Sequence, residues 1–384
     1  MQPSGDGAPL SGLKVVELAR ILAGPWLGQT LADLGADVVK IESPEGDDAR
    51  AWGPPFVRTD GGETSAYFHA CNRGKRSIAL DFRSPQDLET TRALLASADV
   101  VVENFKVGGL EKYGLDYAGV NRLNPRVVYC SITGFGQAGP YASRPGYDFI
   151  VQGMSGIMDL TGDPAGEPQK IGVAFADIFA GLYGVIAVQA ALALRARTGR
   201  GQHIDIALFD CMTGVLANQA MNFLVSGVSP RRLGNVHPNI APYQTFPVSD
   251  GYITIACGND AQFGRLCAIL GAPELTGDHR FVSNAARVGH RDELSDLLSQ
   301  KTAAFSRADL LKALDAGKIP AGPINAVADV FADPQFIARK MQIEVCGVPG
   351  LRTPIVFSDS ALVLDRRAPD LGEHTAEILS EVKR

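Results

Sequence analysis

The chain has 384 residues, of which 46% are hydrophobic and 20% are charged, and its formal net charge is −6. This length favours two domains, and the composition is that of an ordinary globular protein. The acidic balance argues against nucleic acid as the main partner, because phosphate backbones bind basic faces.

The six cysteines form no CxxC pair, and none has a histidine at a zinc-ligand spacing. We therefore expect reduced thiols, a cytoplasmic location and no metal site. The N-terminal residues have neither the basic region nor the apolar region of a signal peptide. The apolar run 172–194 is about long enough to span a bilayer. It contains Asp177 and Gln189, however, so we expect a buried helix of a soluble core and no membrane partner.

Short apolar runs alternate with helical patterns through the first half of the chain. Pro25 and the pair Ser84-Pro85 suit helix starts. This rhythm predicts an α/β fold with a doubly wound, Rossmann-like parallel sheet. The expected strands lie at 14–18, 37–42, 75–81, 99–105, 126–132 and 203–210.

Breaks in the pattern predict the domain organisation. The stretch 226–242 has three prolines and is loop-like, and IPAGPIN at 319–325 breaks the pattern again. The pattern of predicted helices and strands between these breaks differs from the pattern after them. We expect a large domain from 10–200 and 335–384, linkers at 201–233 and 320–334, and a smaller α+β domain at 234–319.

Asp177 is the only charged residue in its apolar run, and an unpaired buried carboxylate is expensive. From position alone, a helix cap and a catalytic nucleophile or base are about equally good explanations. Other candidates follow strands, where ligands of parallel sheets bind. They are the loop 19–25, the basic cluster Arg73, Lys75 and Arg76, the VENF motif at 102–105, the glycine loop 133–140, Tyr147 with Asp148, and His237.

Taken in order, these segments resemble the class III CoA-transferase family. The resemblance runs nearly end to end, from LSGLKVVELARILAGP through CNRGKRSIALD, ADVVVENF, GYDFIVQGMSG and ADIFAGLYG to LGEHT. It implies an interlocked homodimer and CoA transfer from an acyl-CoA to a free carboxylic acid. The aspartate of the motif that matches ADIFAG is the family's nucleophile, so the resemblance gives that role to Asp177.

The resemblance also implies the binding residues. CoA or acyl-CoA is the substrate, and no permanent cofactor is expected. The matching CoA-site positions are Arg20, Ala23, Arg73, Lys75, Arg76, Asn104, Phe105 and Lys112. Substrate or loop contacts are expected from Gly134, Phe135, Tyr147 and His237.

Departures from the family pattern bear on the acceptor. Thr133 and Phe135 stand where formyl-CoA transferase has lysine and tyrosine, and GNVHPN replaces its run of four glycines. The later segments look more like the succinyl-CoA-dependent dicarboxylate transferases. Two alternatives stay open: a 2-methylacyl-CoA racemase, although its GHD motif is GYD at 146–148, and a non-catalytic CoA-binding subunit.

Overall fold

The structure is a computed structural model, described here for residues 7–383, and its chain divides into two compact units. The larger unit contains the chain up to Met158, Lys170–Val228 and the chain from Phe336 onward. The smaller unit contains Asp159–Gln169 and Ser229–Gln335. The chain therefore returns to the larger unit at its C-terminal end.

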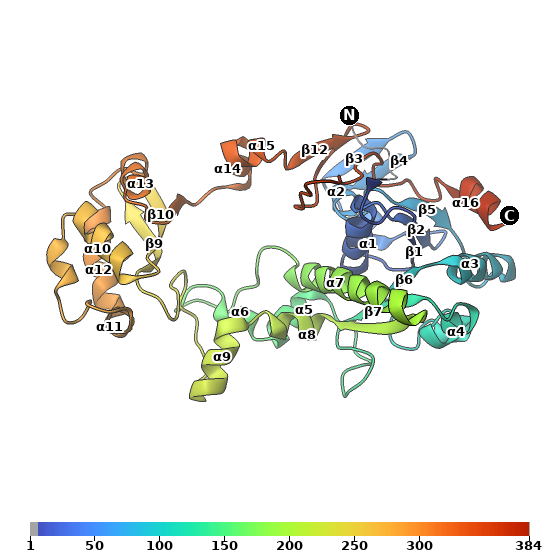
Figure 1. Ribbon diagram of the computed structural model, residues 1–384, viewed down its shortest axis with the longest axis horizontal. Helices are drawn as coiled ribbons and strands as arrows, with labels where there is room; N and C mark the ends of the chain where they lie inside the picture. The colour runs from blue at the N-terminus through green and yellow to red at the C-terminus, as the bar shows by residue number, and fades with distance from the viewer. Residues whose placement is uncertain (1–6, 384) are drawn as a thin grey trace. The chain divides into compact units, whose positions relative to one another are not determined.

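A six-stranded parallel sheet forms the centre of the larger unit (Figure 1). The strand order is β5-β2-β1-β6-β7-β8, so the direction of winding reverses between β1 and β6. This is the order of dinucleotide-binding sheets, in which ligands bind beyond the carboxyl ends at the reversal point. The strands are β1 (Lys14–Glu17), β2 (Asp37–Glu42), β5 (Arg76–Ala79), β6 (Val100–Glu103), β7 (Val128–Thr133) and β8 (Gln202–Ala207).

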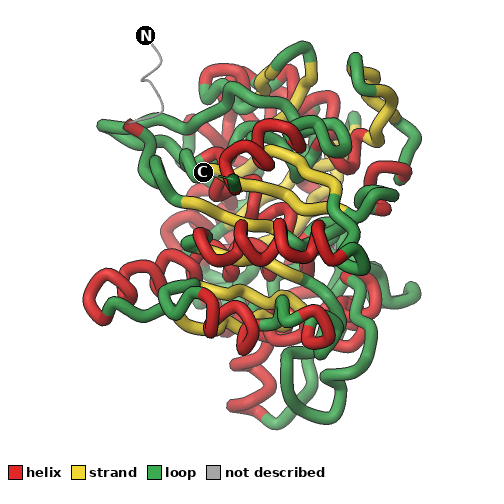
Figure 2. Tube along the Cα trace, turned by 90° about the vertical axis from the view of Figure 1, so that its right-hand side faces the viewer, coloured by secondary structure: helices red, strands yellow, loops and turns green. Residues whose placement is uncertain are grey.

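Helices cover both faces of the sheet, which confirms the predicted doubly wound fold (Figure 2). The strand VVVE at Val100–Glu103 is buried throughout, as expected for a strand with helices on both sides. One face packs against α1 (Ala23–Asp33) and α7 (Phe175–Thr198). The other packs against α3 (Pro85–Ser97), α4 (Tyr117–Leu123) and α16 (Thr375–Val382).

The rest of the larger unit surrounds this sheet. The remaining helices are α2 (Ala66–His69), α5 (Asp148–Met154), α8 (Leu208–Gly214) and α9 (Ala217–Ser226). Two hairpins pair β3 (Phe56–Thr59) with β4 (Gly62–Ser65), and β12 (Gln342–Val345) with β13 (Val348–Leu351). The short helices α6 (Ile157–Leu160) and α15 (Pro334–Ala338) each include residues of both units.

Glycines let α7 lie unusually close to α1. A Cβ on Gly181 would come within 2.8 Å of the Ala23 carbonyl oxygen, and one on Gly184 would overlap the Leu27 side chain. By length and composition α7 is the one helix among residues 7–383 that is able to cross a membrane. One side of α7 packs against α1 and the sheet, but only 28% of its apolar stretch is buried, so the sequence-based expectation of a fully buried helix is not met.

The smaller unit is an antiparallel sheet covered by helices. Its strand order is β11-β10-β9, with β9 (Tyr243–Val248), β10 (Gly251–Ala256) and β11 (Ala321–Pro323). Leucines and phenylalanines of the sheet and helices form its own core. The helices are α10 (Asp260–Ile269), α11 (Asn284–Gly289), α12 (Arg291–Thr302), α13 (Arg307–Ala316) and α14 (Val327–Ala332).

The two predicted linkers are wrong in detail. The segment 201–233 contains β8, which pairs with β7 at the edge of the parallel sheet, and also α8 and α9. The segment 320–334 contains β11, which pairs with β10, and α14. Pro and Gly around both segments mark sharp turns at element ends rather than unstructured connections.

Four buried charges lie together under the carboxyl ends of β1 and β2. The Lys75 ammonium lies 2.8 Å from Glu17, and the Lys40 ammonium lies 3.2 Å from Glu17 and 3.1 Å from Asp47. Glu17, Lys40 and Lys75 are fully buried. Burial alone lowers the pKa of Lys40, but the charges of Glu17 and Asp47 outweigh it and raise that pKa above its usual range. The group is neutral overall, which makes its burial tolerable.

Removing one cation from this group should destabilise the larger unit strongly. In Lys40→Met, Glu17 keeps Lys75 as its one cation, and Asp47 loses its only cation within this group. We therefore expect the free energy of unfolding to fall by about 3–5 kcal/mol. Both tryptophans, Trp26 and Trp52, belong to this unit, so urea titration followed by tryptophan fluorescence reports it directly. The exposed Lys14→Met is the matched control and should change stability by less than about 0.5 kcal/mol. Equal effects of the two substitutions would contradict this prediction.

Candidate active site

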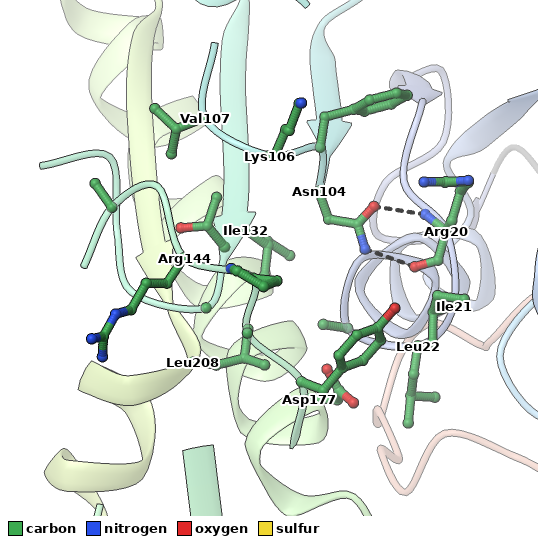
Figure 3. Close-up of a pocket in the computed structure, with 18 residues that line it drawn as sticks. Arg20, Ile21, Leu22, Asn104, Lys106, Val107, Ile132, Arg144, Asp177 and Leu208 are labelled. Carbon is green, nitrogen blue, oxygen red and sulfur yellow. Dashed lines mark hydrogen bonds between the residues drawn. The ribbon is translucent and has the colours of Figure 1, made fainter. Parts of the chain in front are cut away.

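A cavity of about 230 Å³ lies beyond the carboxyl ends of β1, β6 and β7, at the point where the sheet winding reverses (Figure 3). The loop after β1 contributes Arg20, Ile21 and Leu22, and the loop after β6 contributes Asn104–Val107. Asp177, from the first turn of α7, completes the lining beside Gly134 and Tyr147. The fold therefore brings together the loops that the sequence singled out.

Asn104 joins the two loops that flank the reversal point. Its side-chain oxygen accepts a hydrogen bond from the Arg20 amide at 2.8 Å, and its side-chain nitrogen donates to the Arg20 carbonyl at 2.7 Å (Figure 3). The Asn104 side chain therefore satisfies both the amide and the carbonyl of Arg20, as a neighbouring β-strand does for a residue of a sheet. This reciprocal pair fixes the separation of the two loops and leaves the Phe105 ring beside the Arg20 guanidinium, 5.6 Å away.

The loop after β1 is held in a rare backbone conformation. Ile21 has φ of 71°, in the left-handed region that a β-branched residue seldom adopts. The Asp47 carboxylate accepts a hydrogen bond from the Ile21 amide at 3.1 Å. The Lys40 ammonium donates to the Ala19 carbonyl at 2.7 Å. The buried charge group therefore holds this wall of the cavity from behind.

Asp177 is not the cap of its helix. The N-cap position of α7 is Ala174, and Asp177 lies three residues further on. The cap role falls to Asp148 on α5, whose carboxylate accepts a hydrogen bond from the Ala176 amide at 2.8 Å. Among residues 7–383, the Asp177 carboxylate has no hydrogen bond and no ion pair. This leaves it available to react with a ligand in the cavity.

The surroundings of Asp177 disfavour its charge. Burial, and then the negative charge of Asp148, raise the pKa of Asp177 to about 7. Burial and the charge of Asp177 raise the pKa of the Tyr67 phenol, so this phenol keeps its proton. A carboxylate that is poorly solvated and close to its pKa at neutral pH is a suitable nucleophile or base.

A second cavity, of about 420 Å³, lies next to the first in the same unit. Arg20 and Phe105 line both cavities. Three aromatic rings gather in the second one, because Phe82 lies 6.5 Å from Phe105 and 5.7 Å from Tyr113 between ring centroids. An elongated ligand with a flat aromatic end fits this arrangement, with its other end at Asp177.

The structure separates the predicted CoA-site residues into two sets. Arg20, Ala23, Asn104 and Phe105 line the Asp177 cavity, as do the predicted substrate contacts Gly134 and Tyr147. Gly134 lies against Gly146, and the absence of side chains lets these two loops touch. Lys112 lies outside the cavities, with its ammonium 4.7 Å above the ring of Tyr113, which lines the second cavity.

The basic cluster lines neither of these two cavities. Arg73 pairs with Asp33 at 2.6 Å, and Lys75 pairs with the buried Glu17. Arg76 pairs with Asp37, Glu377 and Glu381. All three cations are buried, because they connect β5 and its preceding loop to neighbouring elements. A run of positive charge in the sequence does not reveal that its partners come from distant segments.

The two other predicted contacts, Phe135 and His237, each pack against residues of their own unit. Phe135 packs between Tyr141 and Phe209 and against the core of the larger unit. His237 belongs to the smaller unit, where its ring lies 5.0 Å from that of Tyr243 and its Nδ1 accepts a hydrogen bond from the Asn239 amide. Within their own units, both side chains have structural partners.

Some lining residues escaped the sequence reasoning. Lys106, Val107 and Arg144 line the Asp177 cavity, whereas Ile21 and Leu22 belong to the candidate loop 19–25. Lys106 and Val107 directly follow the VENF motif at 102–105, so including the next two residues of the loop would have found them.

Replacing Asp177 by asparagine should stabilise the protein at neutral and higher pH. Between about pH 4 and pH 7 the folded protein holds a proton on Asp177 that the unfolded chain does not, so wild-type stability falls as the pH rises through this window. We expect Asp177→Asn to gain about 1–3 kcal/mol at pH 8 and nothing below about pH 4. Calorimetric melting at several pH values measures this. The exposed Asp60→Asn is the control, and a gain that does not depend on pH would contradict the argument.

Comparison with known proteins agrees with the site. Residues 10–375 match the model of CoA-transferase family III. The chain is 55% identical to succinate–glutarate CoA-transferase of Agrobacterium fabrum, over 98% of this chain and 96% of that protein. It is 39% identical to human succinyl-CoA:glutarate CoA-transferase, over 98% and 86%.

A solved structure gives the same answer for the fold. A CAIB/BAIF family protein from Brucella suis has 67% sequence identity and a TM-score of 0.89, with 98% of this chain and 100% of that chain covered. The motif order, the parallel sheet and these matches agree with one another. The chain belongs to CoA-transferase family III, and it is a CoA-transferase.

Proposed function

We propose that this enzyme transfers CoA from succinyl-CoA to a dicarboxylic acid such as glutarate, through covalent adducts of Asp177. The observation that carries the proposal is the Asp177 carboxylate, which lines the cavity, has no partner among the described residues and has a pKa near 7. The names of the relatives at 55% and 39% identity support succinyl-CoA as donor and a dicarboxylate as acceptor.

The chemistry begins with the ionised Asp177. Its oxygen attacks the thioester carbonyl, the carbon–sulfur bond breaks, and CoA thiolate leaves, which gives a mixed anhydride of Asp177 and succinate. The thiolate then attacks the Asp177 carbonyl and releases succinate, which leaves CoA on the enzyme as a thioester. The acceptor carboxylate attacks that thioester, and the same two steps in reverse order deliver acyl-CoA and free Asp177. Covalent catalysis replaces one hard transfer by easier ones.

The two adjacent cavities suit an acyl-CoA molecule. We place the thioester at Asp177 and the nucleotide end in the second cavity, where Phe82, Phe105 and Tyr113 offer faces for a flat base. Arg20 and Phe105 line both cavities, so the pantetheine arm passes between them. Lys112, above the Tyr113 ring, is then within reach of phosphate groups.

The charges that line the Asp177 cavity favour a substrate with a second carboxylate. Arg20, Lys106 and Arg144 line it together with the single carboxylate of Asp177. A dicarboxylate presents one carboxylate to the covalent intermediate and keeps the other charged, so a cation near the cavity is needed. This excess of positive charge supports a dicarboxylate over an uncharged acyl group.

The racemase alternative lacks its second proton-transfer group. Such an enzyme needs an acid and a base on opposite sides of the α-carbon. At the GYD motif the histidine is replaced by Tyr147, and Asp148 is occupied by the Ala176 amide and by Gln152. The non-catalytic alternative leaves the unpaired carboxylate of Asp177 without a purpose.

We propose further that the enzyme is a homodimer of interlocked chains in the cytoplasm. Helix α9 carries a strip of exposed apolar side chains, including Phe223, Leu224 at 71% exposure and Val225 at 80%. Helix α7 exposes Tyr183 and Ile186 on the side away from the sheet. Surfaces of this kind are usually covered by another chain. The six free cysteines fit a reducing compartment.

The covalent step has a direct test. After incubation with succinyl-CoA, mass spectrometry should find an adduct on the peptide that contains Asp177, and hydroxylamine should remove it. Asp177→Ala should form no adduct and lose at least about 10³-fold in transfer to glutarate, since the step itself is removed. Asp60→Asn should keep full activity. An Asp177→Ala enzyme with normal transfer would refute the proposed function.

The assembly proposal is tested by light scattering on the purified protein. We expect a mass of twice 40.7 kDa. Charges placed in an apolar interface are strongly unfavourable, so the double variant Leu224→Lys, Val225→Lys should yield monomers or aggregates with lost activity. A monomeric wild-type enzyme with full activity would contradict the proposal.

A further inference from the structure

A buried carboxylate outside the Asp177 cavity supports one of that cavity's loops. Glu103 is the last residue of β6, and it is 6% exposed. Its carboxylate accepts a hydrogen bond from the Phe105 amide at 2.8 Å. It also bonds the hydroxyl of Ser131, which is its register partner on β7. Glu103 thus ties the turn that carries Asn104 and Phe105 to the neighbouring strand.

The connection continues to β8. The Ser131 hydroxyl oxygen lies 2.9 Å from Nε2 of His203, and the His203 ring stacks on Tyr117 with 4.9 Å between ring centroids. A third cavity, of about 220 Å³, is lined by Glu103, Ser131 and His203. Solvent therefore has access to this row of polar side chains, and a proton can be exchanged there.

The two sides of one loop link this cavity to Asp177. Phe105, Lys106 and Val107 line both the third cavity and the Asp177 cavity. Asn104, in the same loop, makes the reciprocal pair with Arg20 (Figure 3). Any change in the hydrogen bond at the Phe105 amide therefore acts on the wall that the acyl-CoA is expected to contact.

We propose that Glu103, supported by Ser131 and His203, is a positioning residue that holds the Asn104–Phe105 turn in the form that binds acyl-CoA, and that its protonation weakens this binding. Glu103 touches neither the substrate nor Asp177, and it acts through the Phe105 amide. The inference rests on the proposed transferase function, because it assumes that CoA contacts this turn.

The direction of the hydrogen bonds depends on one proton. When Glu103 is ionised, the Phe105 amide and the Ser131 hydroxyl both donate to it, and the Ser131 oxygen accepts from Nε2 of a neutral His203. When Glu103 takes up a proton from solvent, its hydroxyl donates to Ser131, which then donates to Nε2 of the other His203 tautomer. The Phe105 amide keeps only a neutral acceptor, and bonds to neutral acceptors are weaker.

The electrostatics place this change near neutral pH. Burial raises the pKa of Glu103, the hydrogen bonds from Ser131 and Phe105 lower it, and the charge of Asp205 raises it further. The net result is a pKa of about 7. Burial lowers the pKa of His203, so this ring is neutral there. Three other titratable groups around Glu103 have hydrogen-bond partners of their own. Asp205 accepts from the Gln137 amide, Asp116 accepts from the Gly119 amide, and the Tyr129 hydroxyl donates to the Leu115 carbonyl. The remaining charged or titratable groups on the wall of the third cavity are Lys106, Glu111 and Tyr117.

Glu103→Gln tests the proposal with little change in shape. Its amide oxygen can still accept from Phe105, but no proton is taken up, so it mimics the neutral form at every pH. Binding of CoA is measured by calorimetry at pH 6 and pH 8 in the Asp177→Asn background, which removes the titration of Asp177. The exposed Glu111→Gln, on the wall of the same cavity, is the matched control.

The expected outcome is a difference in pH dependence. The CoA phosphates also titrate near pH 6, so each Kd is divided by that of the Glu103→Gln protein at the same pH. Relative to Glu103→Gln, the parent and the Glu111→Gln protein should bind CoA roughly fivefold more tightly at pH 8 and about equally at pH 6. With Asp177 restored, Glu103→Gln should raise KM for succinyl-CoA by roughly fivefold at pH 8 and change kcat by less than about twofold.

Parallel Kd-against-pH curves for all three proteins would overturn the proposal, since a purely structural Glu103 alters stability without altering that dependence. If Glu103→Gln does not fold, Ser131→Ala carries the test, because losing the hydroxyl donor should move the weakening of CoA binding to higher pH. An unchanged midpoint would refute the proposal. Failure of the transferase function has a different signature: the parent would bind no CoA at either pH, and wild type would form no Asp177 adduct.

Discussion

The ion pairs of Glu17 with Lys40 and Lys75 are the interaction on which the rest of the larger unit depends. They join β1, β2 and the loop before β5 at the carboxyl edge of the sheet. Removing any one member would leave an uncompensated buried charge, which is far more unfavourable than replacing the whole group by apolar side chains. Helix α1 can lie against this group only because Gly28 has no side chain, as a Cβ there would overlap the Glu17 carboxylate.

The same charges shape the active site. Lys40 donates to the Ala19 carbonyl, and Asp47 accepts from the Ile21 amide, so both ends of the turn between β1 and α1 are anchored from below. This anchoring holds Ile21 in its left-handed conformation, which no β-branched residue would keep alone. Asn104 then joins the turn to the loop after β6. The cavity wall is therefore rigid before any ligand arrives, which favours catalysis that depends on exact placement of a thioester.

Sequence reasoning recovered the features that depend on local pattern. The alternating strands and helices and the helix that starts after Ser84 follow from periodicity and capping chemistry, and the isolated charge singled out Asp177, which lies in the wall of the cavity. It failed where the answer depends on distant partners. Arg73, Lys75 and Arg76 look like a phosphate site until Asp33, Glu17 and Asp37 are brought to them by the fold. Asp177 looks like a cap until Asp148, from another helix, supplies the capping oxygen.

Three carboxylates of this unit, Glu17 and Glu103, which are buried, and Asp177, which is half-buried, show that the neighbours of a charge determine its role. Glu17 lies between two ammonium groups and serves as part of the framework. Glu103 receives donors but no cation, so burial raises its pKa toward neutrality and its protonation can alter a turn. Asp177 has neither donor nor cation among the described residues, and Asp148 lies close enough to repel its charge. In the proposed mechanism acylation removes that charge, so the unfavourable surroundings of the carboxylate would contribute to the reaction at Asp177 and to neither of the others.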